Sequence, residues 1–221
     1  MVDVDFIEIG TSYFGTLIQK ATDDDIGFSV EPLKHYLDQL PDRKNVTKVN
    51  YAIVRDGDVD YMDVYHILPD VLWDTHNNPD SYPEHQRKLP DYLLGCNRMG
   101  EYHPLHLKYM RGKPRDLRPL VQIDKVKVSS VSNFMQEFQI GKIKYLKTDT
   151  EGMDAPIVQG FLDWAEPKGP EFFPQKVQFE SYPLKKSRRE AEELIERMHK
   201  LNYETTLVKM PNITLEYRGG I

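Results

Sequence analysis

Short apolar runs alternate with polar, helix-like stretches over the first 65 residues. The apolar runs at residues 6–9, 26–30 and 46–54 predict strands, and the stretches at 16–21 and 33–40 predict helices, the second ending before Pro41. A turn at residues 56–58 then leads into a further alternating segment. Strands that alternate with helices over short links are typical of βαβ units, so this region predicts a parallel sheet.

The last hundred residues return to the same rhythm. Strands are predicted at residues 121–128, 143–147 and 176–179, and helices at 152–161 and 188–201. Ser129 or Ser130 is a suitable N-cap for another helix that runs through Phe138. Residues 204–209 and 213–217 predict an antiparallel hairpin around Pro211-Asn212.

Residues 66–120 break this pattern. They hold seven of the fifteen prolines and five of the seven histidines, and no periodicity is visible. A long stretch without regular structure inside a compact domain is usually functional or disordered. We expect an irregular insertion that covers an active site as a lid, with a short helix or two. Residues 1–221 then form a single α/β domain.

Composition narrows the class of protein. The 221 residues are 39% hydrophobic and 29% charged, which suits one soluble domain, and the net charge of -6 argues against a nucleic-acid partner. No apolar run approaches the roughly 18 residues of a membrane helix. Cys96 is the single cysteine, which fits a reducing compartment, and no signal-peptide pattern opens the chain. We therefore predict a cytoplasmic location and no membrane span.

The first candidate site is the turn Glu8-Ile9-Gly10-Thr11-Ser12-Tyr13-Phe14-Gly15. It follows a predicted strand and precedes a predicted helix. Glycine lets the backbone approach a ligand closely, and the free N–H groups of a helix start bind polar groups. A plain tight turn in an α/β protein gives the same pattern, so the turn alone leaves both interpretations open.

Glu31 ends the second predicted strand, sixteen residues after Gly15. A carboxylate at this point can accept hydrogen bonds from both hydroxyls of a ribose, which predicts a nucleoside-containing cofactor. A solvated acid at a strand end is the alternative. Because the first turn lacks the G-x-G-x-x-G spacing of pyrophosphate-binding turns, a cofactor without a pyrophosphate is favoured over NAD.

Three carboxylates follow two later strands. Asp149 and Glu151 come directly after the strand at 143–147, and Glu180 follows the strand at 176–179. Because the carboxyl ends of parallel strands meet at one edge of a sheet, these acids are expected to converge there. Such a group predicts a general base, a divalent metal, or both. In the alternative interpretation, Glu151 caps the following helix and Glu180 is solvated.

Four segments together resemble the FkbM-type S-adenosylmethionine-dependent methyltransferases. They are the turn from Glu8 to Gly15, the acid in Val30-Glu31-Pro32, the segment Asn50-Tyr51-Ala52-Ile53-Val54, and Leu146-Lys147-Thr148-Asp149-Thr150-Glu151-Gly152 with Gly160 after it. The last segment is the most specific, because the family typically shows L-K-x-D-x-E-G followed by a helix and a glycine. The first turn departs from the family's usual D-x-G-x-N-x-G. Glu8 and Ser12 replace its aspartate and asparagine, and Phe14 stands where the second glycine would be.

The resemblance implies a Rossmann-like sheet of seven mostly parallel strands, the last of them antiparallel, with helices on both faces. It also implies an O-methyltransferase that uses S-adenosylmethionine. Its acceptor would be a small molecule or a glycan that offers a sugar hydroxyl, for example on a deoxyhexose such as rhamnose. The residues that it assigns to the cofactor are Glu8, Gly10, Thr11, Ser12, Tyr13, Gly15, Glu31, Pro32 and Ala52.

Methyl transfer to a sugar hydroxyl requires that the oxygen be aligned and lose its proton. Because a sugar hydroxyl is a poor acid, Mg²⁺ or Mn²⁺ would help to stabilise the alkoxide. We predict Asp149 and Glu180 as ligands of that metal, and Glu151 as the base or as a residue that orients the ligands. His106, in the insertion, is a competing catalytic base.

Two alternative functions stay open. One is a degenerate methyltransferase fold that only binds a glycan, and the other is a nucleotide-sugar or NAD-dependent oxidoreductase. A predicted strand also begins almost at the first residue. The chain is therefore expected to be either a naturally minimal enzyme or one domain of a longer protein, such as a fusion with a glycosyltransferase domain.

Overall fold

The computed structural model describes residues 1–12, 15–57, 59–106, 116–181 and 185–219, with residues 185 and 186 described by their backbone alone. It divides into two compact units. Unit 1 consists of Met1–Asp60 and Lys127–Ile221, and unit 2 is Tyr61–Val126. Strand β7 (Gln122–Ser130) begins in unit 2 and ends in unit 1.

Unit 1 is built on a seven-stranded sheet in the order β10-β11-β9-β8-β1-β2-β3. The pairs from β3 through β2, β1 and β8 to β9 are parallel, and β11 runs antiparallel to both β9 and β10. The predicted sheet of seven mostly parallel strands is thereby confirmed. The strands are β1 (Val2–Ile9), β2 (Gly27–Val30), β3 (Val46–Val49), β8 (Ile140–Thr148), β9 (Lys176–Glu180), β10 (Tyr203–Lys209) and β11 (Asn212–Tyr217).

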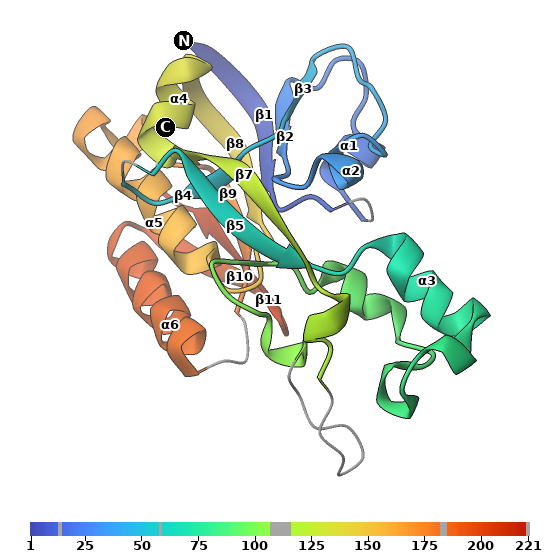
Figure 1. Ribbon diagram of the computed structural model, residues 1–221. Coiled ribbons are helices and arrows are strands. Elements are labelled where there is room, and N and C mark those ends of the chain that lie inside the picture. The colour runs from blue at the N-terminus through green and yellow to red at the C-terminus, as the bar shows by residue number, and fades with distance from the viewer. Residues whose placement is uncertain (13–14, 58, 107–115, 182–184, 220–221) are drawn as a thin grey trace. The chain divides into compact units, whose positions relative to one another are not determined.

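Helices cover both faces of this sheet (Figure 1). Successive residues of a strand point to opposite faces, so Ile7 of β1 enters the larger core while its neighbour Phe6 enters a smaller one. The larger core includes α4 (Val131–Glu137), α5 (Asp154–Ala165) and α6 (Lys185–Lys200), and the smaller one α1 (Leu17–Lys20) and α2 (Lys34–Leu37). Two short 3-10 helices follow α5, η6 (Glu166–Lys168) and η7 (Pro170–Phe172). Among the described helices, none combines the length and hydropathy that a membrane span requires.

The single strand predicted at residues 46–54 is wrong. Only Val46–Val49 belongs to the large sheet, whereas β4 (Ala52–Val54) pairs in parallel with the end of β7. The break falls at Asn50, whose side-chain amide donates to the carbonyl oxygens of Glu31 at 2.9 Å and Pro32 at 2.8 Å. These bonds join Asn50 to the segment beyond β2, and the chain leaves the sheet there.

Helix limits also differ from those predicted. Of the two predicted N-caps of α4, Ser130 serves, accepting from the Asn133 N–H at 3.2 Å. The helix expected at residues 152–161 begins at Asp154 and continues to Ala165, because residues 149–152 form a turn of their own. The helix expected at 33–40 is a single turn, Lys34–Leu37.

Unit 2 contains more regular structure than the predicted insertion and has wider limits. Its described part holds β5 (Tyr61–His66), β6 (Arg98–Met99), α3 (Pro69–Asn77) and the 3-10 helices η1 (Pro79–Ser81), η2 (Glu84–Gln86), η3 (Asp91–Gly95), η4 (Pro104–His106) and η5 (Arg118–Leu120). Leu72, Leu89 and Leu93 are buried. Most of these helices are single turns, too short to give the repeating apolar pattern that reveals a helix in a sequence. The role of unit 2 as a lid stays a prediction.

Candidate functional site

Four strands of unit 1 end side by side at one edge of the sheet. β2, β1, β8 and β9 are consecutive neighbours, and each pair is parallel, so their carboxyl ends lie together. In open α/β sheets, ligands bind just outside this edge. The segments that leave it are the β1 turn (residues 10–12 and 15–16) and the acid turn (residues 149–152). Glu31 and Glu180 lie at the same edge, at the ends of β2 and β9.

Gly10 lets the β1 turn pack directly on the acid turn. Its φ is +78°, and a Cβ placed on it would lie 1.9 Å from the carbonyl oxygen of Asp149. The Gly10 N–H donates to the Val30 carbonyl at 2.9 Å, and the Asp149 N–H donates to the Ile9 carbonyl at 2.9 Å. The close contact between the two turns thus explains why a glycine is needed at position 10. The sequence predicted a contact of Gly10 with the cofactor and did not predict this contact.

The rest of the β1 turn offers polar groups to a ligand. Gly15 has a φ of +66°, and a Cβ on it would meet nothing within 4 Å, so glycine is needed there for backbone conformation. The side-chain oxygens of Thr11 and Ser12 are buried and have no hydrogen-bond partner among the described residues. Buried hydroxyls are normally hydrogen-bonded, so this pair fits a polar ligand. Tyr13, another predicted cofactor residue, lies outside the described residues.

Glu31 is 4% exposed, and its carboxylate faces the backbone of the β1 turn. Oε2 accepts from the Ser12 N–H at 2.8 Å and Oε1 accepts from the Leu33 N–H at 3.0 Å. Burial raises the pKa of Glu31 to about 7, while these two N–H groups oppose the rise. Each oxygen has a second lone pair, which leaves acceptor capacity for the two hydroxyls of a ribose.

Pro32 and Ala52 were assigned to the cofactor by resemblance alone. The Pro32 carbonyl accepts from Asn50, which fixes the segment after Glu31. Ala52 is buried in β4, opposite Val128 of β7. These contacts explain how the two residues are held, and their role toward a cofactor stays a prediction.

Glu8 is fully buried, and both of its carboxylate oxygens are engaged by the protein. Oε1 accepts from the Lys147 ammonium at 2.6 Å, and Oε2 accepts from the Leu17 N–H at 2.6 Å. Burial raises the pKa of Glu8, while Lys147 and the Leu17 N–H favour its charged form. The sequence predicted a cofactor ligand, but the geometry places Glu8 beneath the β1 turn as an ion-pair partner.

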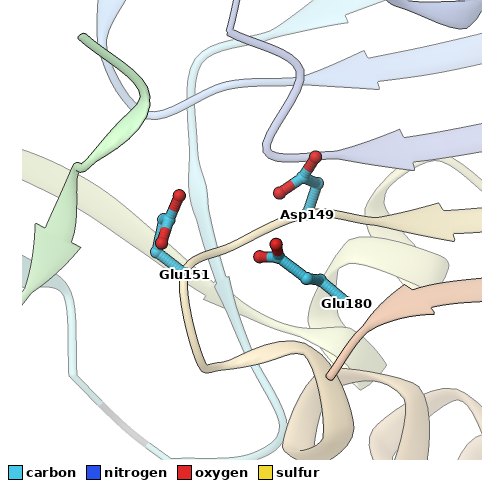
Figure 2. A group of neighbouring side chains, drawn as sticks. All are labelled: Asp149, Glu151 and Glu180. Carbon is cyan, nitrogen blue, oxygen red and sulfur yellow. The ribbon is translucent and has the colours of Figure 1, made fainter. Parts of the chain in front are cut away.

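Three carboxylates gather at the end of the sheet. Figure 2 shows Asp149 and Glu151 on the acid turn and Glu180 at the end of β9. One oxygen from each lies within 4.8 Å of the others. Asp149 is exposed, whereas Glu151 and Glu180 are half-buried. The structure thus brings together the three acids that the sequence separates by up to 31 positions.

The crowding of negative charge shifts two of these acids. Loss of solvation raises the pKa of Asp149 to about 7, and the charges of Asp154 and Glu151 add to the rise. Loss of solvation also raises the pKa of Glu180 to about 8, with Asp149 as the strongest repelling charge. Because Asp149 keeps exposed surface, water screens part of the rise in its pKa. Near neutral pH, such a cluster tends to hold a proton or a cation.

Asp154 anchors the acid turn and was missed in the sequence. It is buried at the start of α5, and its carboxylate accepts from the Thr150 N–H at 3.2 Å, the Thr150 hydroxyl at 3.1 Å and the Gly152 N–H at 3.3 Å. Glu151, between these donors, has a left-handed φ of +53°. An acidic residue in the first turn of a helix is a known start signal, which could have identified Asp154.

The N-cap of α5 is Met153, whose side chain makes no capping hydrogen bond. Glu151 lies two residues before this N-cap, and its role as a helix cap stays a prediction. Its carboxylate also belongs to the group formed with Asp149 and Glu180.

His106 lies in unit 2 and is fully buried. Its ring centroid is 5.7 Å from that of His103. Burial, followed by the neighbouring His103, lowers the pKa of His106 to about 4. An imidazole with this pKa is a weak base at neutral pH, so its surroundings do not support the predicted catalytic role.

The order of these segments in the chain agrees with a known protein family. A family model described as the methyltransferase FkbM domain matches residues 11–205. The chain belongs to this family. The matched range of this FkbM methyltransferase includes Glu31, the acid turn and Glu180, whereas Glu8 and Gly10 lie just before it. The resemblance drawn from the motifs is thereby confirmed. Searches of curated proteins and of solved structures give no significant match.

Proposed function

We propose that this FkbM methyltransferase transfers a methyl group from S-adenosylmethionine to a hydroxyl of a sugar. The observation that carries the proposal is the juxtaposition, at one sheet edge, of the β1 turn with Glu31 and of three clustered carboxylates. The β1 turn and Glu31 suit the binding of a nucleoside, and the three carboxylates suit the removal of a proton from the acceptor. The mostly parallel sheet with its antiparallel β11 fits the Rossmann-like arrangement that the resemblance implies.

The cofactor would be held by the β1 turn and by Glu31. The Glu31 carboxylate, held by the Ser12 and Leu33 N–H groups, would accept from the ribose hydroxyls. The hydroxyls of Thr11 and Ser12, which have no partner in the described part of the chain, would bind polar atoms of the same ligand. Bound S-adenosylmethionine supplies an electrophilic methyl group on a sulfonium centre.

The acids would align the acceptor oxygen and take its proton. Correct alignment supplies on the order of 7–11 kcal/mol of an activation barrier, and a placed base adds about 10²- to 10⁴-fold in rate. Asp149 and Glu180 have pKa values raised to about 7 and about 8, close to the pH at which a general base is most effective. Glu151 lies beside them and can orient the same hydroxyl.

A divalent cation is a second way to use this cluster. Mg²⁺ prefers carboxylate oxygens and usually binds one or two of them together with water. The spacing of the three acids fits that donor set, so we propose Asp149 and Glu180 as ligands of Mg²⁺ or Mn²⁺. A metal bound there would lower the pKa of the acceptor hydroxyl.

The charge of the site favours a neutral acceptor. Three carboxylates lie close together, and Lys147, two residues before Asp149, is paired with Glu8. When no cation is bound, a phosphate or carboxylate on the acceptor would be repelled, whereas the hydroxyls of an uncharged hexose or deoxyhexose can donate hydrogen bonds to these acids. We propose such a sugar, free or within a glycan, as the substrate class.

The proposal is tested by transfer of labelled methyl groups. The full chain is incubated with methyl-tritiated S-adenosylmethionine, Mg²⁺ and a panel of methyl glycosides that includes neutral hexoses, deoxyhexoses and uronic acids. We expect label in neutral sugars, in a form that resists mild alkali because a methyl ether does not hydrolyse. Asp149→Asn should abolish this label while the protein still binds S-adenosylhomocysteine.

Label in uronic acids that mild alkali releases would contradict sugar O-etherification. A chain that binds S-adenosylhomocysteine but labels no sugar of the panel would favour the degenerate binding module instead. Oxidation of a sugar with reduction of NAD would favour the oxidoreductase.

A further inference from the structure

Glu8 and Lys147 form a buried ion pair between two strands that each lead into part of the site. They are direct partners in the parallel register of β1 and β8, so their side chains lie on the same face of the sheet. Glu8 Oε1 and Lys147 Nζ are 2.6 Å apart, with 0% and 15% of their side chains exposed. The pair is therefore largely shielded from solvent and from salt.

The same pair is connected to both turns. The second oxygen of Glu8 accepts from the Leu17 N–H at 2.6 Å, at the point where the β1 turn enters α1. Lys147 is two residues before Asp149, whose N–H donates to the Ile9 carbonyl. Above the pair, Gly10 lies against the Asp149 carbonyl. Glu8 thus ties the far end of the β1 turn to its own strand, and Lys147 ties that strand to the one that carries the acids.

We propose that Glu8 and Lys147 are positioning residues that hold the β1 turn in its cofactor-binding shape, so that Lys147 controls cofactor affinity without contacting the cofactor. The inference rests on the proposed function, because it takes S-adenosylmethionine as the ligand of the β1 turn. It differs from the expectation that Glu8 binds the cofactor directly.

The two single substitutions should destabilise the protein to different extents, because the ion pair is buried. Lys147→Met removes the cation and leaves a carboxylate buried with one N–H partner, which is strongly unfavourable. Glu8→Gln is milder, because the amide oxygen can still accept one hydrogen bond, from either the Leu17 N–H or Lys147. In the double variant no buried charge is left, so folding should recover although the link between the strands is lost.

The test is a double-mutant cycle on the full chain. Affinity for S-adenosylhomocysteine is measured by titration calorimetry for the parent, Lys147→Met, Glu8→Gln and the double variant, well below each melting temperature. We expect Lys147→Met to weaken binding by about ten-fold or more. Residues of one network show coupling energies of this size. The double variant should lose no more affinity than Lys147→Met, because the second change removes a link that is already broken. Leu194→Ala, a cavity in the core at α6, is the control for lost stability and should leave affinity unchanged.

Each outcome has a distinct meaning. Parent-like affinity in Lys147→Met overturns the positioning role, and so does a double variant whose loss is the sum of the two single losses, since Glu8 would then act on the cofactor independently. Equal losses of affinity in Lys147→Met and Leu194→Ala would mean that the effect comes from lower overall stability, and this result would also overturn the positioning role. If the parent itself fails to bind, the proposed function fails first, and this is visible before any variant is compared.

Discussion

At the scale of single residues, Gly10 and Gly15 show two different reasons for a glycine in one turn. Gly10 needs both a positive φ and the absence of a side chain, because the Asp149 carbonyl occupies the place of a Cβ. Gly15 needs only the positive φ, because a Cβ there would meet nothing within 4 Å. The sequence predicts a special backbone at both positions but cannot distinguish these reasons, since the neighbour of Gly10 comes from residues far away in the chain.

Alanine at the two positions should therefore differ in effect. Gly15→Ala should destabilise the protein by about 1–2 kcal/mol, the usual penalty for a left-handed residue with a side chain. Gly10→Ala adds a backbone clash and should cost about 4 kcal/mol or more. Urea unfolding followed by circular dichroism measures both values. Equal losses would mean that the contact between the turns is less close than described.

Asp149 should be a destabilising residue above neutral pH. Its pKa rises from 3.8 to about 7 on folding, so the folded state binds the proton more tightly than the unfolded chain. Stability from this group is present below pH 3.8 and is lost as pH rises through 7. Asp149→Asn should then raise the melting temperature at pH 8, by about 2–4 °C if solvent screening leaves roughly 1 kcal/mol of the effect. Near pH 4 the gain should disappear.

Asp154→Asn is the matched control for Asp149→Asn. Asp154 is another acid of the same turn region, but it is buried and its carboxylate accepts three hydrogen bonds that an amide cannot fully replace. This variant should melt at a lower temperature at both pH values. A rise in melting temperature for Asp154→Asn, or a fall for Asp149→Asn at pH 8, would contradict the roles assigned to the two residues.

At the scale of elements, the sequence predicts most strands of unit 1 and the edge where its acids meet. Buried strands such as residues 6–9 show as mostly apolar runs, and the side chains that follow such strands must lie at the carboxyl edge. The limits of the third strand could not be predicted, because Asn50 ends it through bonds to carbonyls nineteen and eighteen residues earlier. The pairing of Glu8 with Lys147 could not be predicted either. The two residues are 139 positions apart in the chain, and they meet only because of the register between β1 and β8.

Unit 2 should be sensitive to acid through His106. Its pKa falls from 6.5 to about 4 on folding, so the unfolded chain binds more protons between these values. Stability is then lost as pH drops from 6.5 towards 4, by up to roughly 3 kcal/mol. His106→Leu should reduce this loss, measured by hydrogen exchange in peptides of unit 2 at pH 7 and pH 4.5. His85→Leu, at an exposed position of the same unit, is the control and should behave like the parent. Unchanged acid sensitivity in His106→Leu would contradict the prediction.

At the scale of the whole molecule, the proposed metal site predicts how the melting temperature of the chain responds to divalent cations. If Asp149 and Glu180 are metal ligands, millimolar Mg²⁺ or Mn²⁺ should raise the melting temperature of the parent, because a ligand that binds only the folded state stabilises it. Glu180→Gln should lose that response, and a potassium salt of equal ionic strength should not reproduce it in either protein. An equal rise of the melting temperature in the parent and in Glu180→Gln would mean that the cation binds at a site other than the acid cluster.

The most direct test of the account is the melting temperature of the full chain with and without S-adenosylhomocysteine. A ligand at about 100 times its dissociation constant stabilises by roughly 2.7 kcal/mol, which in a chain of this size is a shift of roughly 5–11 °C. We predict such a shift for the parent, little or none for Glu31→Ala, and none for the parent with NADH. No shift at millimolar S-adenosylhomocysteine, or a full shift in Glu31→Ala, would contradict the proposed cofactor site.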